Sequence, residues 1–215
     1  MEMKKNIILL GSAGINSATA ALLFSDKIHF VLNFSFGDKN TTESEYAKDL
    51  YNNVLKLPFK QIVTNSWLRL DEFESYSIPI GLFITTAASI ACSEDCNTIM
   101  LPVHKRINPN LPGFAMKDIR ILNKYLKTIT NGKVRLSTPF INIQKYQIMI
   151  LGKYHGFDYK LTQSCNKNVS PACGLCPSCQ LRTISEMKSN NVIKRIGLQQ
   201  AYDNVSKKIY LKNID

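Results

Sequence analysis

The sequence lacks any long apolar run. The apolar residues Ile7 to Leu10 are followed directly by Gly11, so this run is too short for the core of a signal peptide. No other stretch approaches the roughly 20 apolar residues that a membrane span requires. We therefore expect a soluble, cytoplasmic protein, in which cysteines remain reduced and can bind metal rather than form disulfides.

Histidine is scarce, with three residues in 215, and there is no internal repeat or low-complexity segment. The spacing of these histidines supports neither a Ser-His-Asp nor a Cys-His arrangement. The sequence therefore does not predict a hydrolase that uses a serine or cysteine nucleophile.

Acidic residues are outnumbered, 16 against 27 lysines and arginines, which gives a net charge of +11. Such a charge suits an anionic partner. The basic residues are scattered, however, and the densest cluster, His104 to Arg106, has no interleaved aromatic residues. This pattern favours a solvated basic surface over a nucleic-acid site, although a basic zinc-containing module that binds nucleic acid stays open as an alternative.

Cysteine is concentrated near the C-terminal end. Four of the six cysteines fall between residues 165 and 179 and include two overlapping CxxC steps, with Gly174 and Pro177 at the turns. Four thiolates complete the tetrahedron that Zn²⁺ prefers, and a site without an open position is structural. We interpret the cluster as a structural zinc site, with disulfides or a redox CxxC as the alternative. The proposed ligands are Cys165, Cys173, Cys176 and Cys179.

Short apolar runs alternate with amphipathic segments along the chain, which predicts an open, mostly parallel α/β sheet. We expect strands over 6–10, 28–36, 61–64, 98–102 and 134–136, and helices over 18–24, 46–57, 80–91, 116–130 and 143–154. In the helix over 116–130, the residues expected to face inward are Ile119, Leu122, Leu126 and Ile129.

Small residues follow the first expected strand, from Gly11 to Ser17, and a helix comes next. A strand, a small-residue loop and a helix present backbone N–H groups and a helix N-terminus to a phosphate. Small residues also occur at such turns for steric reasons alone, so the loop by itself leaves anion binding open.

Several segments, read together with this loop, resemble the 7-cyano-7-deazaguanine synthases, which belong to the PP-loop ATP pyrophosphatases. The resemblance covers most of the chain, from the first loop to Arg182. The segments that carry it are Ser137-Thr138-Pro139-Phe140-Ile141, Gly156-Phe157-Asp158-Tyr159, Leu161-Thr162-Gln163-Ser164-Cys165 and the cysteine cluster with Gln180-Leu181-Arg182.

The resemblance implies a Rossmann-like domain over 1–160 that binds ATP and a zinc-binding module over 161–215. The family adenylates the carboxylate of 7-carboxy-7-deazaguanine, releases pyrophosphate, and captures the acyl adenylate with ammonia. A second ATP then activates the amide for dehydration to the nitrile. Mg²⁺ is a candidate cofactor of this chemistry, and a homodimer or a partner protein is left open.

The family's loop reads SGGxDS, which the resemblance places on Ser12, Ala13, Gly14, Ile15, Asn16 and Ser17 as ATP-binding residues. Ser12, Asn16 and Ser17 are the catalytic candidates. Asn16 stands where the family has aspartate, and a neutral amide is a poorer ligand for a hard cation. Ala13 adds a methyl group where the family has glycine.

Two further segments depart from the family. The family usually has an Arg-Asn pair after the proline that precedes its buried helix, whereas this chain has Pro79-Ile80-Gly81; Leu111 to Ala115 replaces a Tyr-Pro-Asp-Cys-Arg segment. His104, Lys105 and Arg106 could substitute as cations at the sheet edge. We expect an ATP-dependent ligase that activates the carboxylate of 7-carboxy-7-deazaguanine and forms an amide or nitrile, and a changed amine acceptor such as a protein is a variant of this reaction. The alternative is a catalytically degenerate paralogue that binds nucleotide or deazaguanine or serves as a partner subunit.

Overall fold

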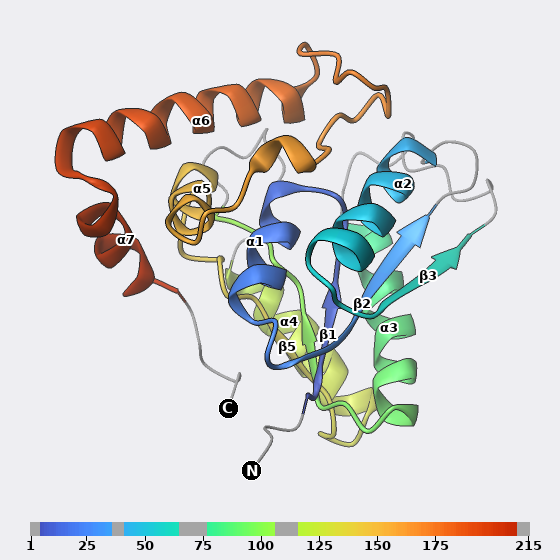
Figure 1. The fold of residues 1–215 in the computed structure, drawn as a ribbon. Helices are drawn as coiled ribbons and strands as arrows, with labels where there is room; N and C mark the ends of the chain where they lie inside the picture. The colour runs from blue at the N-terminus through green and yellow to red at the C-terminus, as the bar shows by residue number, and fades with distance from the viewer. Residues whose placement is uncertain (1–4, 36–40, 65–76, 106–115, 210–215) are drawn as a thin grey trace.

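The computed structural model describes residues 5–35, 41–64, 77–105 and 116–209, and these form a five-stranded sheet covered by helices on both faces (Figure 1). All strand pairs are parallel, and the order is β3-β2-β1-β4-β5. The expected Rossmann-like α/β fold is therefore confirmed. The strands are β1 (Ile7–Leu10), β2 (Ile28–Ser35), β3 (Phe59–Val63), β4 (Thr98–Met100) and β5 (Arg135–Ser137).

The helices follow the strands in alternation, as the apolar pattern predicted. They are α1 (Ile15–Leu23), α2 (Thr41–Asp49), the π-helix η2 (Leu50–Val54), α3 (Ser77–Ser93), α4 (Met116–Ile129), α5 (Lys145–Tyr154), the 3₁₀ turn η4 (Tyr159–Leu161), α6 (Pro177–Ile196) and α7 (Leu198–Ser206). No helix in the described ranges combines the length and apolar character that a bilayer crossing needs.

The central strand β1 is buried on both faces, which explains its unbroken Ile-Ile-Leu-Leu sequence. Ile7 and Leu9 contribute to a core with α1, α5 and α7. Ile8 and Leu10 point to the other face, into a second core with α3 and α4. The sheet thus separates two apolar layers. Because both faces are covered, a polar site is expected at the ends of the strands.

Two details of the expected helices are wrong. Ile129 is 45% exposed, because it occupies the last position of α4, beyond the buried residues Ile119 and Leu126. The expected helix over 46–57 is split, because α2 gives way to the wider π-helix at Leu50. The N–H of Leu55 donates to the carbonyl oxygen of Leu50 at 2.9 Å, a π-helical step.

The C-terminal helices are fixed to the α/β core. Ala201 and Val205 of α7 are buried in the same apolar layer as α1 and α5. Arg182 of α6 donates to the carbonyl oxygen of Thr162 at 2.9 Å, to its hydroxyl at 3.0 Å, and to the carbonyl oxygen of Tyr159. Figure 1 shows α6 lying across α5. The division at residue 160 stays a prediction.

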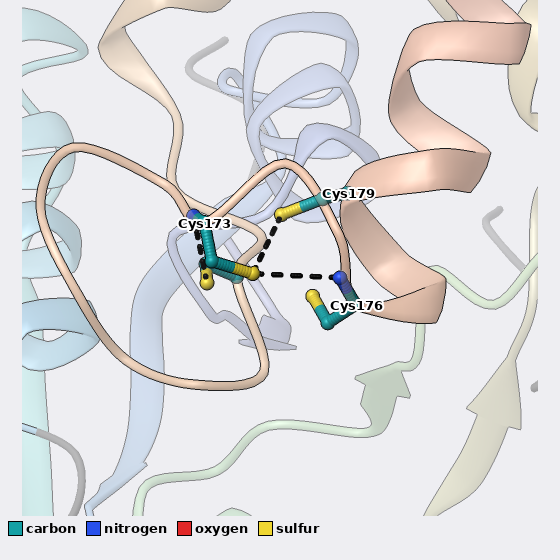
Figure 2. A group of neighbouring side chains, drawn as sticks. Cys173, Cys176 and Cys179 are labelled. Atoms are coloured by element: carbon teal, nitrogen blue, oxygen red, sulfur yellow. Dashed lines mark hydrogen bonds between the residues drawn. The ribbon is translucent and has the colours of Figure 1, made fainter.

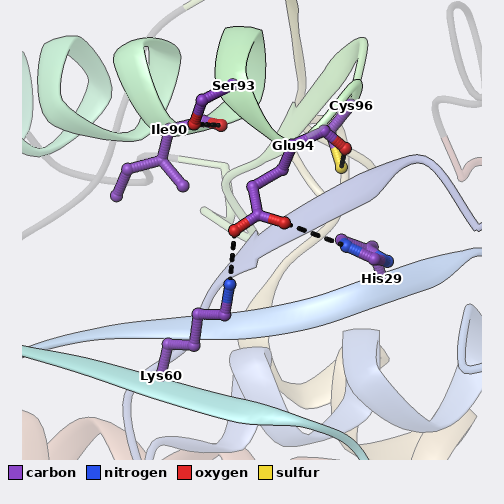
Figure 3. A network of polar contacts seen from close by, with 6 residues as sticks. All are labelled: His29, Lys60, Ile90, Ser93, Glu94 and Cys96. Atoms are coloured by element: carbon purple, nitrogen blue, oxygen red, sulfur yellow. Dashed lines mark hydrogen bonds and ion pairs between the residues drawn. The ribbon is translucent and has the colours of Figure 1, made fainter.

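An ion cluster lies near the N-terminal end of β2 (Figure 3). The small-residue loop lies at the opposite, C-terminal end of the parallel strands, directly after β1. Glu94 accepts a contact from Lys60 at 2.6 Å and lies 3.6 Å from His29 Nε2. Lys60 holds the pKa of Glu94 below its usual range. The groups are solvent-exposed, so we assign this cluster a minor structural role.

Candidate functional site

A cavity of about 470 Å³ opens at the C-terminal ends of β1, β2 and β4. The chain leaves β1 for β2 on one side, while β4 lies on the other, so this is a topological switch point, where open α/β sheets bind ligands. Its walls come from the loop after β1, the end of β2, the loop after β4, the start of α5 and the cysteine cluster. The side chains and backbone that line it include those of Ser12, Gly14, Ile15, Asn16, Ser17, Asn33, Phe34, Glu43, Ile80, Phe83, Pro102, His104, Lys145, Gln163, Ser164, Cys165, Asn166, Asn168 and Ser178.

The loop after β1 brings backbone donors to this cavity. Gly14 is the N-cap of α1, with no side-chain cap, so the first-turn N–H groups of Ile15, Asn16 and Ser17 are available to a ligand. The N–H of Ser12 donates to Ser17 Oγ at 3.3 Å, and the N–H of Gly14 donates to Ser12 Oγ at 3.2 Å. The loop is therefore already shaped around an open helix N-terminus, which attracts anions.

Tyr51 holds this loop in place from below. Its hydroxyl donates to the carbonyl oxygen of Ser12 at 2.7 Å, and the side chain is fully buried. The π-helix η2 carries Tyr51. Gly11 is required here, because a Cβ at that position would overlap Val31 Cγ1 and approach the Tyr51 hydroxyl. A regular helix over residues 46–57 does not predict this role of Tyr51.

Asn33 extends the support under the loop. Its Nδ2 donates to the carbonyl oxygen of Gly11 at 2.8 Å, and its Oδ1 accepts from Gln61 Nε2 at 2.9 Å. β2, β3 and the loop are therefore joined by side-chain hydrogen bonds at the floor of the cavity.

Asn16 bridges the loops after β1 and β4. Its Nδ2 donates to the carbonyl oxygen of Pro102 at 3.0 Å and lies 3.1 Å from His104 Nδ1. Burial, and then the nearby Lys145, lower the pKa of His104 to about 4, so its imidazole is neutral at pH 7. The expectation that His104 serves as a cation is wrong. Lys105 is exposed, and Arg106 lies outside the described residues.

The charged groups of the cavity are ones that the sequence did not reveal. Burial, followed by the charge of Arg182, lowers the pKa of Lys145 to about 8. Burial raises the pKa of the Glu43 carboxyl, and a hydrogen bond with Ser12 opposes this shift. Lys145 comes from the start of α5 and Glu43 from the first turn of α2. Only their common position at one sheet edge marks them as functional.

The four cysteines of the predicted zinc site come together in space, at the start of α6 and in the loop before it. Figure 2 shows the side chains of Cys173, Cys176 and Cys179 directed toward one another. The sulfur atoms of these three cysteines and of Cys165 all lie within 4.8 Å of one another. A tetrahedral zinc with Zn–S bonds of about 2.3 Å places sulfurs about 3.8 Å apart, so a small contraction closes the site.

The surroundings of the sulfurs also fit a metal. The N–H groups of Cys173, Cys176 and Asn166 donate to the sulfurs of Cys165, Cys173 and Cys176 at 3.4–3.5 Å. Burial acts to raise the pKa of Cys176, but such hydrogen bonds outweigh it and lower that pKa to about 6, while burial raises the pKa of Cys179 to about 12. A divalent cation would offset two of the four negative charges of four thiolates. The cluster can therefore hold a metal.

The cysteine cluster is part of the cavity wall. The N–H of Gln163 donates to the carbonyl oxygen of Ala13 at 2.9 Å, and the N–H of Glu43 donates to Asn168 Oδ1 at 2.8 Å. Cys165, Asn168 and Ser178 line the cavity. The cysteine cluster and the loop 12–17 are thus two walls of one site.

The site combines the groups that a nucleoside polyphosphate would use. Backbone N–H groups, serine hydroxyls and Lys145 can bind phosphate oxygens. Phe34 and Phe83, stacked with ring centroids 4.3 Å apart, offer an apolar wall. The structure brings together all six residues of the loop, five of them at the cavity itself and Ala13 buried behind it. Which of them perform chemistry stays a prediction.

Known proteins resemble this chain along most of its length. The 7-cyano-7-deazaguanine synthase of Sulfurihydrogenibium sp. is 29% identical over 211 residues, covering 85% of this chain and 94% of the relative. That of Aquifex aeolicus is 28% identical, covering 83% and 95%. Among solved structures, the U34-tRNA thiolase NcsA from Methanococcus maripaludis, with its [4Fe-4S] cluster, has a TM-score of 0.49 and 11% identity, covering 100% of this chain and 74% of that chain.

A sequence model described as "Queuosine biosynthesis protein QueC" matches residues 71–188, more than half of the 215 residues. The match contains α3, α4, α5 and the four cysteines, so it includes three of the cavity walls: the loop after β4, the start of α5 and the cysteine cluster. The cavity, the parallel sheet and these relatives agree with one another: the chain belongs to the family of the queuosine biosynthesis protein QueC.

Proposed function

We propose that this protein is an ATP-dependent ligase that activates the carboxylate of 7-carboxy-7-deazaguanine and joins it to nitrogen. The observation that carries this proposal is the shared cavity, in which the open N-terminus of α1 faces the segment Cys165 to Asn168. The relatives, named 7-cyano-7-deazaguanine synthases, support the substrate. We propose residues 1–160 as the nucleotide-binding domain and 161–215 as the zinc-binding module.

The proposed reaction begins when a carboxylate oxygen attacks the α-phosphorus of ATP and the bond to the β-phosphate breaks. Ser12, Ser17 and the N–H groups of the α1 first turn bind phosphate oxygens, and Lys145 neutralises charge on the departing pyrophosphate. An amine then attacks the acyl carbon and loses a proton, and AMP leaves with the former carboxylate oxygen. The product is an amide; where the amine is ammonia, a second ATP can activate this primary amide for loss of its oxygen to give a nitrile, whereas a substituted amide is the end product.

Zinc and magnesium have different proposed places. Cys165, Cys173, Cys176 and Cys179 hold Zn²⁺ as a structural ion, which fixes the wall that Asn168 and Ser178 form. Mg²⁺ prefers carboxylates and phosphate oxygens, and Glu43 is the carboxylate among the described cavity residues. Asn16 could offer only a neutral oxygen. We propose Glu43 as the protein group closest in chemistry to a magnesium ligand.

The acceptor amine is a separate question, and we propose that it differs from free ammonia. Ile80 lines the cavity directly after Pro79, where the family's resemblance placed an Arg-Asn pair. An apolar side chain thus stands where the family has a guanidinium, and an apolar wall suits an amine with an apolar stem, such as a lysine of a protein. The segment 111–115, which also departs from the family, lies outside the described residues.

Turnover with defined amines tests the proposal. Zinc-loaded protein would be incubated with ATP, Mg²⁺ and 7-carboxy-7-deazaguanine, with ammonia or a lysine peptide as the amine, and pyrophosphate and product mass would be followed. We expect pyrophosphate release that depends on the deazaguanine. Pyrophosphate release without the deazaguanine, or no release with any amine, would contradict the proposal.

A second candidate function is a non-catalytic protein that binds nucleotide or deazaguanine or acts as a partner subunit. The contacts of Asn16 favour it, because both N–H bonds of its amide are used by Pro102 and His104. Asn16→Asp would restore the family's carboxylate. If only this variant turns over, the natural protein is a binding protein; if the natural protein turns over, this candidate is excluded.

A further inference from the structure

The amide of Asn16 has a fixed orientation. Its Nδ2 lies 3.0 Å from the carbonyl oxygen of Pro102, which can only accept a hydrogen bond. The atom at this position must therefore be the amide nitrogen, and Oδ1 must point elsewhere. The second N–H of the same amide lies toward His104 Nδ1, at 3.1 Å.

This orientation determines the tautomer of His104. A nitrogen that accepts a hydrogen bond carries no proton, so Nδ1 is the bare nitrogen of a neutral ring. The proton of the ring therefore resides on Nε2. Burial and the neighbouring Lys145 keep the pKa of His104 near 4, which maintains the neutral form at physiological pH.

His104 lines the cavity, and its Nε2 is the ring nitrogen left over for a ligand once Nδ1 is used by Asn16. No described residue bonds to it, and it is not one of the fully buried polar atoms without a partner. Lys145 and Glu43 are the other titratable side chains that line the cavity with His104, apart from the metal-ligand candidate Cys165. The residue that carries this N–H donor therefore lines the same site as an ammonium and an open helix N-terminus.

We propose that His104 is a ligand-binding residue that donates its Nε2–H to an anionic oxygen of a phosphate or carboxylate, and that Asn16 is the positioning residue that selects this tautomer. The inference rests on the proposed ATP site and deepens it. An aspartate at position 16 would recruit a cation to the phosphates. This chain has the neutral pair Asn16 and His104 instead, and the N–H of His104 can bind a phosphate oxygen without a metal ion.

The geometry explains why an aspartate would not fit here unchanged. A carboxylate at position 16 would direct an oxygen at the carbonyl oxygen of Pro102, and two acceptors repel each other. Rotated toward His104, it would favour a protonated ring and raise the pKa of His104. Asn16 therefore favours one protonation state of His104, the neutral ring with its proton on Nε2.

The tautomer can be observed directly in the ligand-free protein. The protein has three histidines, His29, His104 and His155, so ¹⁵N-histidine labelling gives an assignable spectrum. We expect His104 to remain the Nε2–H tautomer between pH 6 and 8, whereas Asn16→Asp should make it titrate within that range. A proton on Nδ1, or titration of the natural His104 near pH 6.5, would overturn the inference.

Binding of inorganic pyrophosphate and of ATP in EDTA tests the ligand contact without turnover. His104→Leu should weaken binding about ten-fold, as expected for loss of a hydrogen bond to a charged group. His104→Gln, which keeps an N–H near the Nε2 position, should retain most of the affinity. His155→Gln, at an exposed histidine outside the cavity, is the matched control.

The outcomes separate this inference from the proposed function. Equal affinities of natural protein and His104→Leu would overturn the role of His104 even if the enzyme turns over. Weakened binding together with absent turnover would support the contact and count against the ligase. Folding of each variant is checked from its unfolding midpoint, and His104→Gln distinguishes loss of the donor from loss of structure.

Discussion

Lys145 is the only lysine or arginine among the described residues that line the cavity, so the phosphate-binding role falls on it. Lys145→Met should weaken ATP binding about 10- to 100-fold, because hydrogen bonds to charged groups contribute about 1.5–3 kcal/mol. Lys160→Met, at an exposed lysine outside the cavity, is the control. Equal ATP affinities of Lys145→Met and Lys160→Met, measured by calorimetry, would exclude this role.

The charge state of Lys145 predicts a pH dependence of binding. Burial lowers the pKa of Lys145 to about 8, so the free protein loses this positive charge as the pH rises through 8. Affinity for ATP should therefore be highest below pH 8 and fall between pH 8 and 9. Lys145→Arg keeps its charge across this range, and its affinity should change little. A natural protein with the same flat profile would contradict the assignment.

Other residues show why the site was only partly predictable. The loop 12–17 and the four cysteines could be found in the sequence because their spacing is local. Glu43 and Lys145 could not, because they reach the cavity only when α2, α5 and the sheet are assembled. The position of His104 at the sheet edge could be predicted, but its charge could not, because burial and the nearby Lys145 lower its pKa.

At the scale of elements, the support beneath the loop predicts a stability difference between two glycines. Gly11→Ala would push a methyl group into Val31 and Tyr51, whereas Gly81 in α3 has no neighbour within 4 Å of a new Cβ. Gly11→Ala should lower the free energy of unfolding by about 1–3 kcal/mol. Gly81→Ala should be neutral or stabilise by up to about 1 kcal/mol, since alanine favours helix. Urea unfolding measures both.

Equal stabilities of these two variants would show that the packing of Gly11 against Tyr51 is not tight.

The alternation of apolar and amphipathic segments predicted some of the elements and not others. Apolar runs gave the order of strands and helices, because burial on both faces of β1 leaves a clear pattern. The π-helix η2 leaves no such pattern, and its Tyr51 contacts the carbonyl oxygen of Ser12, which is far away in the sequence.

For the whole molecule, the proposed zinc site at the cysteine cluster connects stability to the cavity. One zinc ion per chain is expected, and Cys173→Ala should lose it and lower the unfolding temperature, because zinc binding contributes to folding. ATP affinity should fall in the same variant, since Asn168 and Ser178 of this module line the cavity. Cys92→Ser is the control, because Cys92 is exposed and outside the cluster.

Metal analysis and thermal unfolding of both variants decide this prediction. A Cys173→Ala protein that keeps zinc and its unfolding temperature would contradict the ligand set. One that loses zinc while binding ATP normally would instead show that the module does not shape the cavity.

The central claim is that the cavity activates a carboxylate with ATP, and isotope transfer tests it most directly. 7-Carboxy-7-deazaguanine labelled with ¹⁸O in its carboxylate would be incubated with the protein, ATP and amine, and the nucleotide product analysed by mass spectrometry. Attack of the carboxylate on the α-phosphorus predicts AMP that carries one ¹⁸O atom, released with pyrophosphate. Unlabelled AMP, or ADP with phosphate, would contradict the account.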